Sequence, residues 1–382
     1  MRELYKMTLV ALLVFAPVGV ASAFHAGGVA HCDGCHSMHN SADNPVSGAT
    51  NNLLLKGSDA SSTCLNCHNG SGSYHVNSTD GSNVNQGGDY YWMTLTYNVV
   101  VRGNTAVFEA DNHGHNIVAV DYGFLADQDP DNAQAPGGTY PAASLGCTSC
   151  HDAHGKVNGG TANGSPPISG SGSYGAVDPN DGSILGNYRI LGSTGYQTGG
   201  TTFTDPAPVA ASSGFGPPGF GASVDYGSGM SEWCANCHPD YINDSHKHPA
   251  GDGEHLNGQA TNYNLYVATG DFTGVQATSY DGLVPFERGE TVGSNLTPNG
   301  TVGPDASSNV MCLTCHRSHA SANANAGKWD FEVEFLAHSH ALESPDVPVG
   351  AAVYYDNGVV IDPVAEYGQY QRSLCNKCHV QD

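Results

Sequence analysis

The sequence has few basic residues and lacks a long apolar run outside its N-terminus. Its 382 residues include 12 lysines and arginines against 36 aspartates and glutamates, a formal net charge of −24. Nucleic acid and anionic membrane surfaces are themselves negative, so this charge argues against both as partners. Beyond the first residues no stretch of 18 or more apolar residues occurs, and the sequence predicts no membrane span.

The chain also lacks the composition of an ordinary globular core. Only 13% of its residues are charged, and 50 glycines and 20 prolines interrupt most stretches long enough for a helix. A chain so rich in turn-forming residues needs another apolar framework around which to fold. We therefore expect mostly coil, with short helices, a few short strands and little regular secondary structure.

No cysteine is left over once one short motif is counted. All twelve cysteines belong to six copies of Cys-x-x-Cys-His: Cys32–Cys35–His36, Cys64–Cys67–His68, Cys147–Cys150–His151, Cys234–Cys237–His238, Cys312–Cys315–His316 and Cys375–Cys378–His379. This is the attachment motif of c-type haem, in which both thiols add to the porphyrin and the histidine ligates the iron. Six rigid porphyrins would supply the missing apolar framework, with the chain wrapped around a chain of haems.

The alternatives for these motifs are zinc sites, redox-active cysteine pairs and disulfides. Zinc usually draws two Cys-x-x-Cys pairs into one site and does not require a histidine directly after each pair. Six fortuitous histidines at that position have odds of roughly one in 10⁷ to 10⁸. The motifs therefore predict six covalently attached haem c groups.

Residues 1–23 are typical of a secretory signal peptide. Arg2 and Lys6 precede an apolar segment, and the small residues Ala21-Ser22-Ala23 form a cleavage pattern. The apolar segment is too short for a membrane anchor. We expect residues 24–382 to form a single secreted hexahaem unit without separable globular domains.

The motifs punctuate segments of uneven length, so no single stacked repeat is expected. Successive motifs begin 32, 83, 87, 78 and 63 residues apart. Aromatic and β-branched residues at 90–101 and 117–122 predict short strands or a hairpin. Short helices are expected at haem motifs, as at 231–242 and 309–319.

Two further segments have ambiguous patterns. Residues 156–229 contain many Gly-Gly, Pro-Pro and Ser-Gly steps, which indicate either a flexible linker or an ordered coil. Acids alternate from Asp127 to Asp131 as in a calcium-binding loop, but the glycine and the terminal glutamate of that loop are missing. We interpret this second segment as a solvated turn.

Histidine is abundant enough to ligate every iron twice. Six of the 19 histidines belong to motifs, and thirteen others remain. A methionine ligand would raise a haem potential, but only Met38, Met230 and Met311 lie close to motifs. The surplus favours bis-histidine ligation throughout. Irons closed on both faces favour electron transfer, and we do not expect an enzyme.

Three motifs are followed by a second histidine, at His39, His154 and His319. A histidine three residues beyond the proximal one cannot readily turn to the opposite face of its own iron, but it can reach a neighbouring haem. Each could otherwise be an ordinary polar histidine. The shared spacing predicts close haem pairs that form a relay.

The chain resembles the polymerising multihaem outer-surface cytochromes over most of its length. The resemblance is carried, among other stretches, by Phe24-His-Ala-Gly-Gly-Val-Ala, Ser-Met-His39-Asn, Ser-Tyr-His75, Gly-His115-Asn-Ile-Val, Cys-His151-Asp-Ala-His154, Tyr188-Arg-Ile-Leu-Gly, Met230-Ser-Glu-Trp, His248-Pro-Ala-Gly and His-Arg-Ser-His319-Ala. These stretches occur in order and extend outside the haem motifs. The match weakens at 157–186 and 320–372.

The resemblance implies an extracellular filament, or nanowire, of identical subunits that carries electrons to extracellular acceptors such as metal oxides. It implies that His39 ligates the haem at Cys312 and Cys315 of the neighbouring subunit. The other candidate distal ligands are His25, His75, His115, His154, His248 and His319. These seven compete for six places, and His25 is the first we set aside.

Two other functions remain open from the residues alone. One is a soluble monomeric periplasmic multihaem electron carrier. The other is a multihaem reductase with one open haem iron.

Overall fold

The computed structural model describes residues 32–37, 54–72, 74–83, 85–101, 104–153, 188–212, 223–242, 248–339, 354–356 and 359–379. The predicted signal peptide lies outside the described residues, as does most of the segment predicted to be a linker or coil.

The helices are short, and most of them include cysteines of a haem motif. They are α2 (Cys32–Cys35), α3 (Ala60–His68), α4 (Cys147–Cys150), α5 (Met230–Ala235), α6 (Gly258–Leu265), α7 (Cys312–Cys315), α8 (Pro363–Tyr367) and α9 (Asn376–His379). Single 3₁₀ turns occur at Tyr90–Thr94, Ala110–Asn112, Val120–Tyr122, Pro130–Asn132, Ala142–Ser144, Tyr188–Ile190, Pro239–Ile242, Gln276–Thr278, Gly293–Asn295, Ala324–Ala326 and Leu336–His338. The prediction of short helices gathered at the motifs is confirmed.

The described strands form separate two-stranded antiparallel hairpins. They pair β1 (Tyr97–Val101) with β2 (Asn104–Phe108), β3 (Gln197–Thr198) with β4 (Thr201–Thr202), β5 (Val209–Ser212) with β6 (Val224–Ser228), and β7 (Tyr354–Asp356) with β8 (Val359–Ile361). Each pairing joins segments close in sequence, so the entropy cost of closing the loop is small.

The strand prediction at 90–101 is partly wrong. Residues Tyr90–Thr94 form a 3₁₀ turn, because the Asp89 carboxylate accepts the Tyr91 N–H and caps it. The following strand β1 pairs with β2 in the register Tyr97↔Phe108 and does not pair with residues 117–122. The end of that second segment is itself a 3₁₀ turn, Val120–Tyr122.

Both ambiguous segments are resolved where the structure describes them. In the Gly- and Pro-rich stretch, residues 188–212 and 223–229 are ordered and carry the strands β3 to β6. In the acidic stretch, Asp127 Oδ1 accepts the Asp129 N–H at 2.8 Å and Asp129 Oδ1 accepts the Asp131 N–H at 2.9 Å. These carboxylates cap their own turn, which confirms the solvated-turn interpretation.

Buried tyrosines provide much of the apolar packing. Tyr196, Tyr263 and Tyr280 are nearly inaccessible to solvent, and each hydroxyl donates to a backbone carbonyl, of Thr148, Val284 and Val224 at 2.6, 2.8 and 2.9 Å respectively. In these three residues the ring is buried and the hydroxyl still has a partner. Described buried residues gather in several small clusters, around Trp92, Trp329 and Tyr226, and do not form one core.

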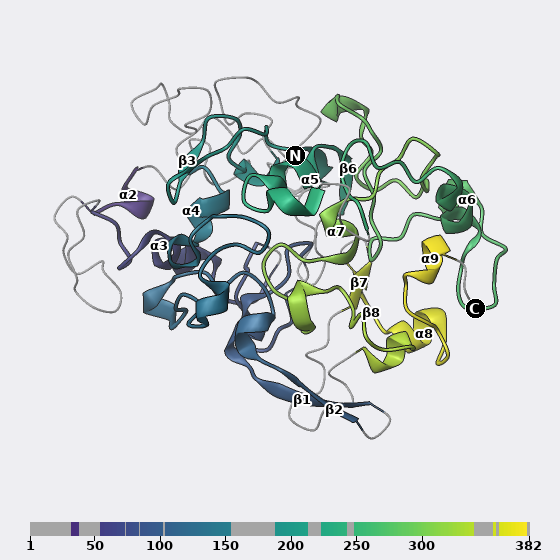
Figure 1. Cartoon of the computed structure of the whole chain (residues 1–382), viewed down its shortest axis with the longest axis horizontal. Coiled ribbons are helices and arrows are strands. Elements are labelled where there is room, and N and C mark those ends of the chain that lie inside the picture. The colour runs from purple at the N-terminus through teal and green to yellow at the C-terminus, as the bar shows by residue number, and fades with distance from the viewer. Residues whose placement is uncertain are drawn as a thin grey trace, which may run out of the picture.

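The helices that carry haem motifs follow one another along the long axis of the molecule. In Figure 1 they run from α2 and α3 through α4, α5 and α7 to α9, in sequence order. Contacts between α3 and α4 and between α5 and α7 connect neighbouring motifs. The fold thus arranges its motifs in a row.

Two glycines let distant segments cross beside one of these motifs. Gly88 and Gly114 each form a β-bridge with Ala320, just after the candidate ligand His319. A Cβ on Gly114 would lie 2.1 Å from the His319 carbonyl oxygen, and a Cβ on Gly88 would lie 1.9 Å from that of Ala320. Backbone cannot yield as a flexible side chain can, so only glycine fits.

Gly114→Ala should therefore lower the free energy of unfolding by about 2 kcal/mol or more, because overpacking forces the two backbones apart. Chemical denaturation of the holoprotein measures this. The matched control is Gly258→Ala at the start of α6, where a Cβ meets nothing within 4 Å. A variant Gly114→Ala as stable as this control would contradict the steric argument.

Candidate haem sites

Each motif forms a single helical turn that ends at its histidine. The backbone N–H groups of His151, His238, His316 and His379 donate to the carbonyl of the first cysteine of their own motif at 2.9 to 3.1 Å. Residues three apart in such a turn lie on the same face, so both sulfurs of a motif point to one side. No disulfide joins the cysteines whose side chains the structure describes.

Hydrogen bonds fix the orientation of four proximal imidazoles. Nδ1 of His68, His151, His238 and His316 bonds to the backbone carbonyls of Tyr74, Arg189, Pro136 and Asn325 at 2.8, 2.9, 2.7 and 2.9 Å. A carbonyl can only accept, so the proton sits on Nδ1 and the lone pair on Nε2. This is the tautomer that a metal requires, held by a partner on the far side of the ring.

We number the motifs 1 to 6 in chain order. Motifs 1, 3 and 5, which carry the second histidine, share one arrangement of backbone hydrogen bonds, which we call the backbone frame. In each, the residue after the proximal histidine donates its N–H to a carbonyl on a returning segment: of Leu54, Ile190 and Ala326 at 2.7 Å in all three. The residue two positions beyond that acceptor donates back to the second cysteine of the motif, at 2.8 to 2.9 Å.

The acceptors in this frame adopt an unusual backbone conformation. Leu54, Ile190 and Ala326 have φ values of 55°, 52° and 53°, in the left-handed region that residues with a Cβ rarely occupy. Sequence reasoning missed the frame, because the signal that marks such a position is glycine and none of the three is glycine.

Three described pairs of histidines face one another. The ring centres of His151 and His319 lie 6.3 Å apart, and those of His238 and His115, and of His379 and His248, lie 6.0 Å apart. Two imidazoles on one metal have ring centres about 6 Å apart, since each metal–nitrogen bond adds about 2.0 Å to roughly 1.1 Å within the ring. The pairs therefore fit axial ligation of a haem iron between them.

The distal members of two pairs are partly buried, and their surroundings keep them neutral. Burial, with His151 and His115 nearby, lowers the pKa of His319 to about 3. Burial and the neighbouring His238 lower the pKa of His115, whose Nδ1 bonds to the Ser318 carbonyl at 2.7 Å. Both rings are thus in the unprotonated form that binds metal.

Of the other candidate ligands, His75 lies within the described residues. Burial, and then the neighbouring His68, lower the pKa of His75, which directly follows Tyr74, whose carbonyl bonds to Nδ1 of His68. Among described residues the ring neighbour of His316 is Phe331, at 5.6 Å. His25, His39 and His154 lie outside the described residues.

Thiols of consecutive motifs lie together at two junctions. A hydrogen bond with the Cys147 thiol, followed by burial, raises the pKa of Cys64, and Cys312 does the same to Cys234. The two junctions share a further contact: the N–H of Cys147 donates to Ser61 Oγ at 3.0 Å, and that of Cys312 to Ser231 Oγ at 3.1 Å. Each serine lies three residues before the first cysteine of the preceding motif, a spacing visible in the sequence.

At the junctions of motifs 1 and 2, 3 and 4, and 5 and 6, a cysteine of one motif has a smaller effect on the pKa of a cysteine in the other. Cys35 contributes to the raised pKa of Cys64. After burial, the charge of Cys237 raises the pKa of Cys150, which reaches about 12, and the charge of Cys375 raises that of Cys315, also about 12. Each motif therefore lies next to the motif that follows it in the chain, from motif 1 to motif 6.

Across the described ranges, no helix combines the length and apolar character needed to cross a membrane.

No known family model matches this chain. It is 39% identical to the C-type cytochrome OmcS of Geobacter sulfurreducens, in an alignment that covers 100% of this chain and 99% of that protein. Two solved structures, an Outer Membrane Cytochrome S filament and OmcS nanowires from the same organism, each superpose with a TM-score of 0.73 at 38% identity, covering 94% of this chain and 100% of theirs. The predicted fold of mostly coil around haem motifs is confirmed, and the chain belongs to the OmcS family of multihaem c-type cytochromes.

Proposed function

We propose that this protein is a secreted hexahaem cytochrome that polymerises into an extracellular filament and carries electrons to acceptors such as metal oxides. The observation that carries the proposal is the set of facing histidine pairs, 6.0 to 6.3 Å between ring centres, on motifs that adjoin one another in sequence order. Residues 24–382 form the working unit, and its relatives supply the precedent for filaments. The twelve motif cysteines attach the haems.

The odd-numbered motifs follow one rule of ligation. His319, the second histidine of motif 5, faces His151 of motif 3, two motifs earlier. Since motifs 1, 3 and 5 share one backbone frame, His154 of motif 3 ligates the iron of motif 1 opposite His36. By the same rule, His39 of motif 1 reaches the motif that lies two places before it.

That place lies outside the chain, in motif 5 of the neighbouring subunit. His316 of motif 5 has no facing histidine among the described residues, and its iron needs one. His39 of the adjoining subunit supplies the ligand. An axial bond across the interface couples haem ligation to polymerisation.

The even-numbered motifs follow a second rule, which revises one sequence expectation. His115 faces motif 4 and lies before motif 3, and His248 faces motif 6 and lies before motif 5. The ligand of motif 2 should therefore lie before motif 1, where His25 is found. His75 then has no axial role, whereas the sequence favoured setting His25 aside.

This scheme leaves no iron open. Six haems, when bound, take up and release single electrons, and the protein holds them in a row with histidines on both faces. Bis-histidine ligation favours low-spin, low-potential iron and outer-sphere transfer. A reductase would need one iron face without a protein ligand, so it is the weaker alternative.

His39→Ala should abolish filaments and keep the haems. Cysteines still attach the haem of motif 5, whose iron loses its ligand, so pyridine haemochrome assays should still give six per chain, while electron microscopy should show at least about a tenfold loss of polymer. His75→Ala is the control and should form normal filaments. Wild-type-length filaments of the His39 variant would rule out the intersubunit ligand, and wild-type protein that is monomeric would favour the periplasmic carrier.

His25→Ala and His75→Ala also test the even-motif rule. Loss of His25 should convert one of six haems from low spin to high spin in electron paramagnetic resonance spectra, because its iron loses an axial ligand. Loss of His75 should leave all haems low-spin. The reverse result would assign the ligand of motif 2 to His75.

A further inference from the structure

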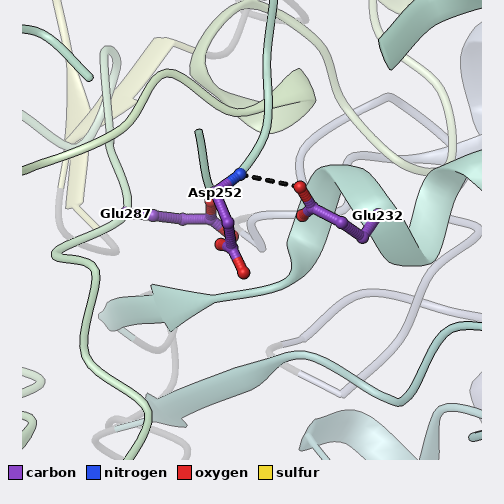
Figure 2. A group of neighbouring side chains, drawn as sticks. All are labelled: Glu232, Asp252 and Glu287. Carbon is purple, nitrogen blue, oxygen red and sulfur yellow. Dashed lines mark hydrogen bonds between the residues drawn. The ribbon is translucent and has the colours of Figure 1, made fainter. Parts of the chain in front are cut away.

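Three carboxylates converge where motifs 4 and 5 meet, and the haem scheme does not use them. Glu232 lies on α5, Asp252 follows the candidate ligand His248, and Glu287 precedes α7 in the chain. One oxygen atom from each lies within 4.8 Å of the other two. Figure 2 shows the three side chains pointing toward one another from separate segments.

Backbone groups satisfy only one side of this cluster. Glu232 Oε1 accepts the Asp252 N–H at 2.7 Å, Glu287 Oε1 accepts the Met230 N–H at 2.6 Å, and Asp252 Oδ1 accepts the Gly229 N–H at 3.0 Å. The second oxygens of Glu232 and Glu287 are buried without a hydrogen-bond partner. Glu287 is 0% exposed, and an unpartnered carboxylate oxygen at such depth is costly.

The matching junction between motifs 2 and 3 shows that the fold can satisfy carboxylates fully. There Asp59 accepts from the Ser62 N–H and hydroxyl and from the Val120 N–H, while both Asp121 oxygens accept from Ser58. Each of those oxygens has a donor. The junction between motifs 4 and 5 is built on the same serine contact and leaves two oxygens without one.

The three carboxylates repel one another at this distance, and burial makes the charged form of Glu287 more costly still. A proton would neutralise only one of the three carboxylates. A divalent cation contacts all three.

We propose that Glu232, Asp252 and Glu287 bind one calcium ion. Calcium prefers carboxylate oxygens at 2.3–2.6 Å, so two oxygens on the same ion lie up to about 5 Å apart, which accommodates the 4.8 Å limit of this cluster. Asp252 is exposed, so water can complete the irregular, larger shell that calcium accepts and magnesium does not.

The ion would join three parts of the haem row. Glu232 lies two residues before Cys234 of motif 4, and Asp252 lies four residues after His248, which faces His379 of motif 6. Glu287 pairs with Asn309 through backbone hydrogen bonds at 2.7 and 3.0 Å, close to motif 5. Calcium would thus tie the segment of a distal ligand to two haem-motif turns.

Equilibrium dialysis of the holoprotein against about 1 mM Ca²⁺ in salt tests the site, since extracellular calcium modules bind in the 10⁻⁴–10⁻³ M range. Wild type should bind one more ion per chain than Glu287→Gln, which keeps the side-chain shape and loses the charge. Glu290→Gln is the matched control: its carboxylate is already bonded to the Val292 N–H and to Asn295, and it should bind as wild type does.

Stability gives an independent readout. Ca²⁺ should raise the melting temperature of wild type and of Glu290→Gln by about 3 °C and leave Glu287→Gln unchanged. If Glu287→Gln does not fold, Glu232→Gln replaces it. Equal calcium binding by wild type and the cluster variants, or binding of Mg²⁺ in preference to Ca²⁺, would overturn the assignment.

Discussion

The hydrogen bond from a proximal imidazole to a backbone carbonyl is the constraint on which the rest of this structure depends. It fixes the proton on Nδ1 and turns Nε2 toward the place of the iron. The acceptors lie 6 to 102 residues away from their histidines. The segments that follow or precede these motifs therefore have a defined structural role, which is to place a backbone carbonyl behind the imidazole, as seen for four of the proximal histidines.

That role explains why backbone strain is concentrated beside the motifs. Leu54, Ile190 and Ala326 occupy left-handed conformations that cost of order 1–3 kcal/mol each. The two backbone hydrogen bonds that flank each of them hold the conformation in place. The same need for close backbone approach accounts for Gly88 and Gly114, whose missing side chains allow the segment bearing His319 to pass between them.

The alternation of odd and even motifs gives the array its direction. In the described pairs, the second histidine of motif 5 faces motif 3, two motifs earlier, while the histidines that face motifs 4 and 6 lie before motifs 3 and 5 respectively. With such an offset, a histidine near one end of the row and an iron near the other end have no partner within the same chain. In our proposal the neighbouring subunit completes it, and the interface is continuous with the interior of the row.

The sequence alone determined the type of cofactor, the shortness of the helices and strands, and the family. Six Cys-x-x-Cys-His motifs indicate covalent haem without any fold, because the chemistry needs only two thiols and an imidazole within one turn. The excess of glycine and proline foretold short elements. The resemblance to the polymerising outer-surface cytochromes, seen in ordered stretches outside the motifs, identified the family.

Other features were decided only by tertiary structure, because they depend on contacts between residues far apart in the chain. Nothing in the spacing of His115, His248 and His319 says which motif each one faces, and nothing near Glu232 announces Asp252 and Glu287. The aromatic and β-branched residues at 90–101 and 117–122 also led to a wrong strand prediction. The Asp89 cap stabilises a 3₁₀ turn at Tyr90–Thr94, and this outweighs the strand preference of those residues. The sequence determined which groups are present, and the folded chain decided which of them meet, since only folding brings a returning carbonyl or a distant imidazole to a given motif.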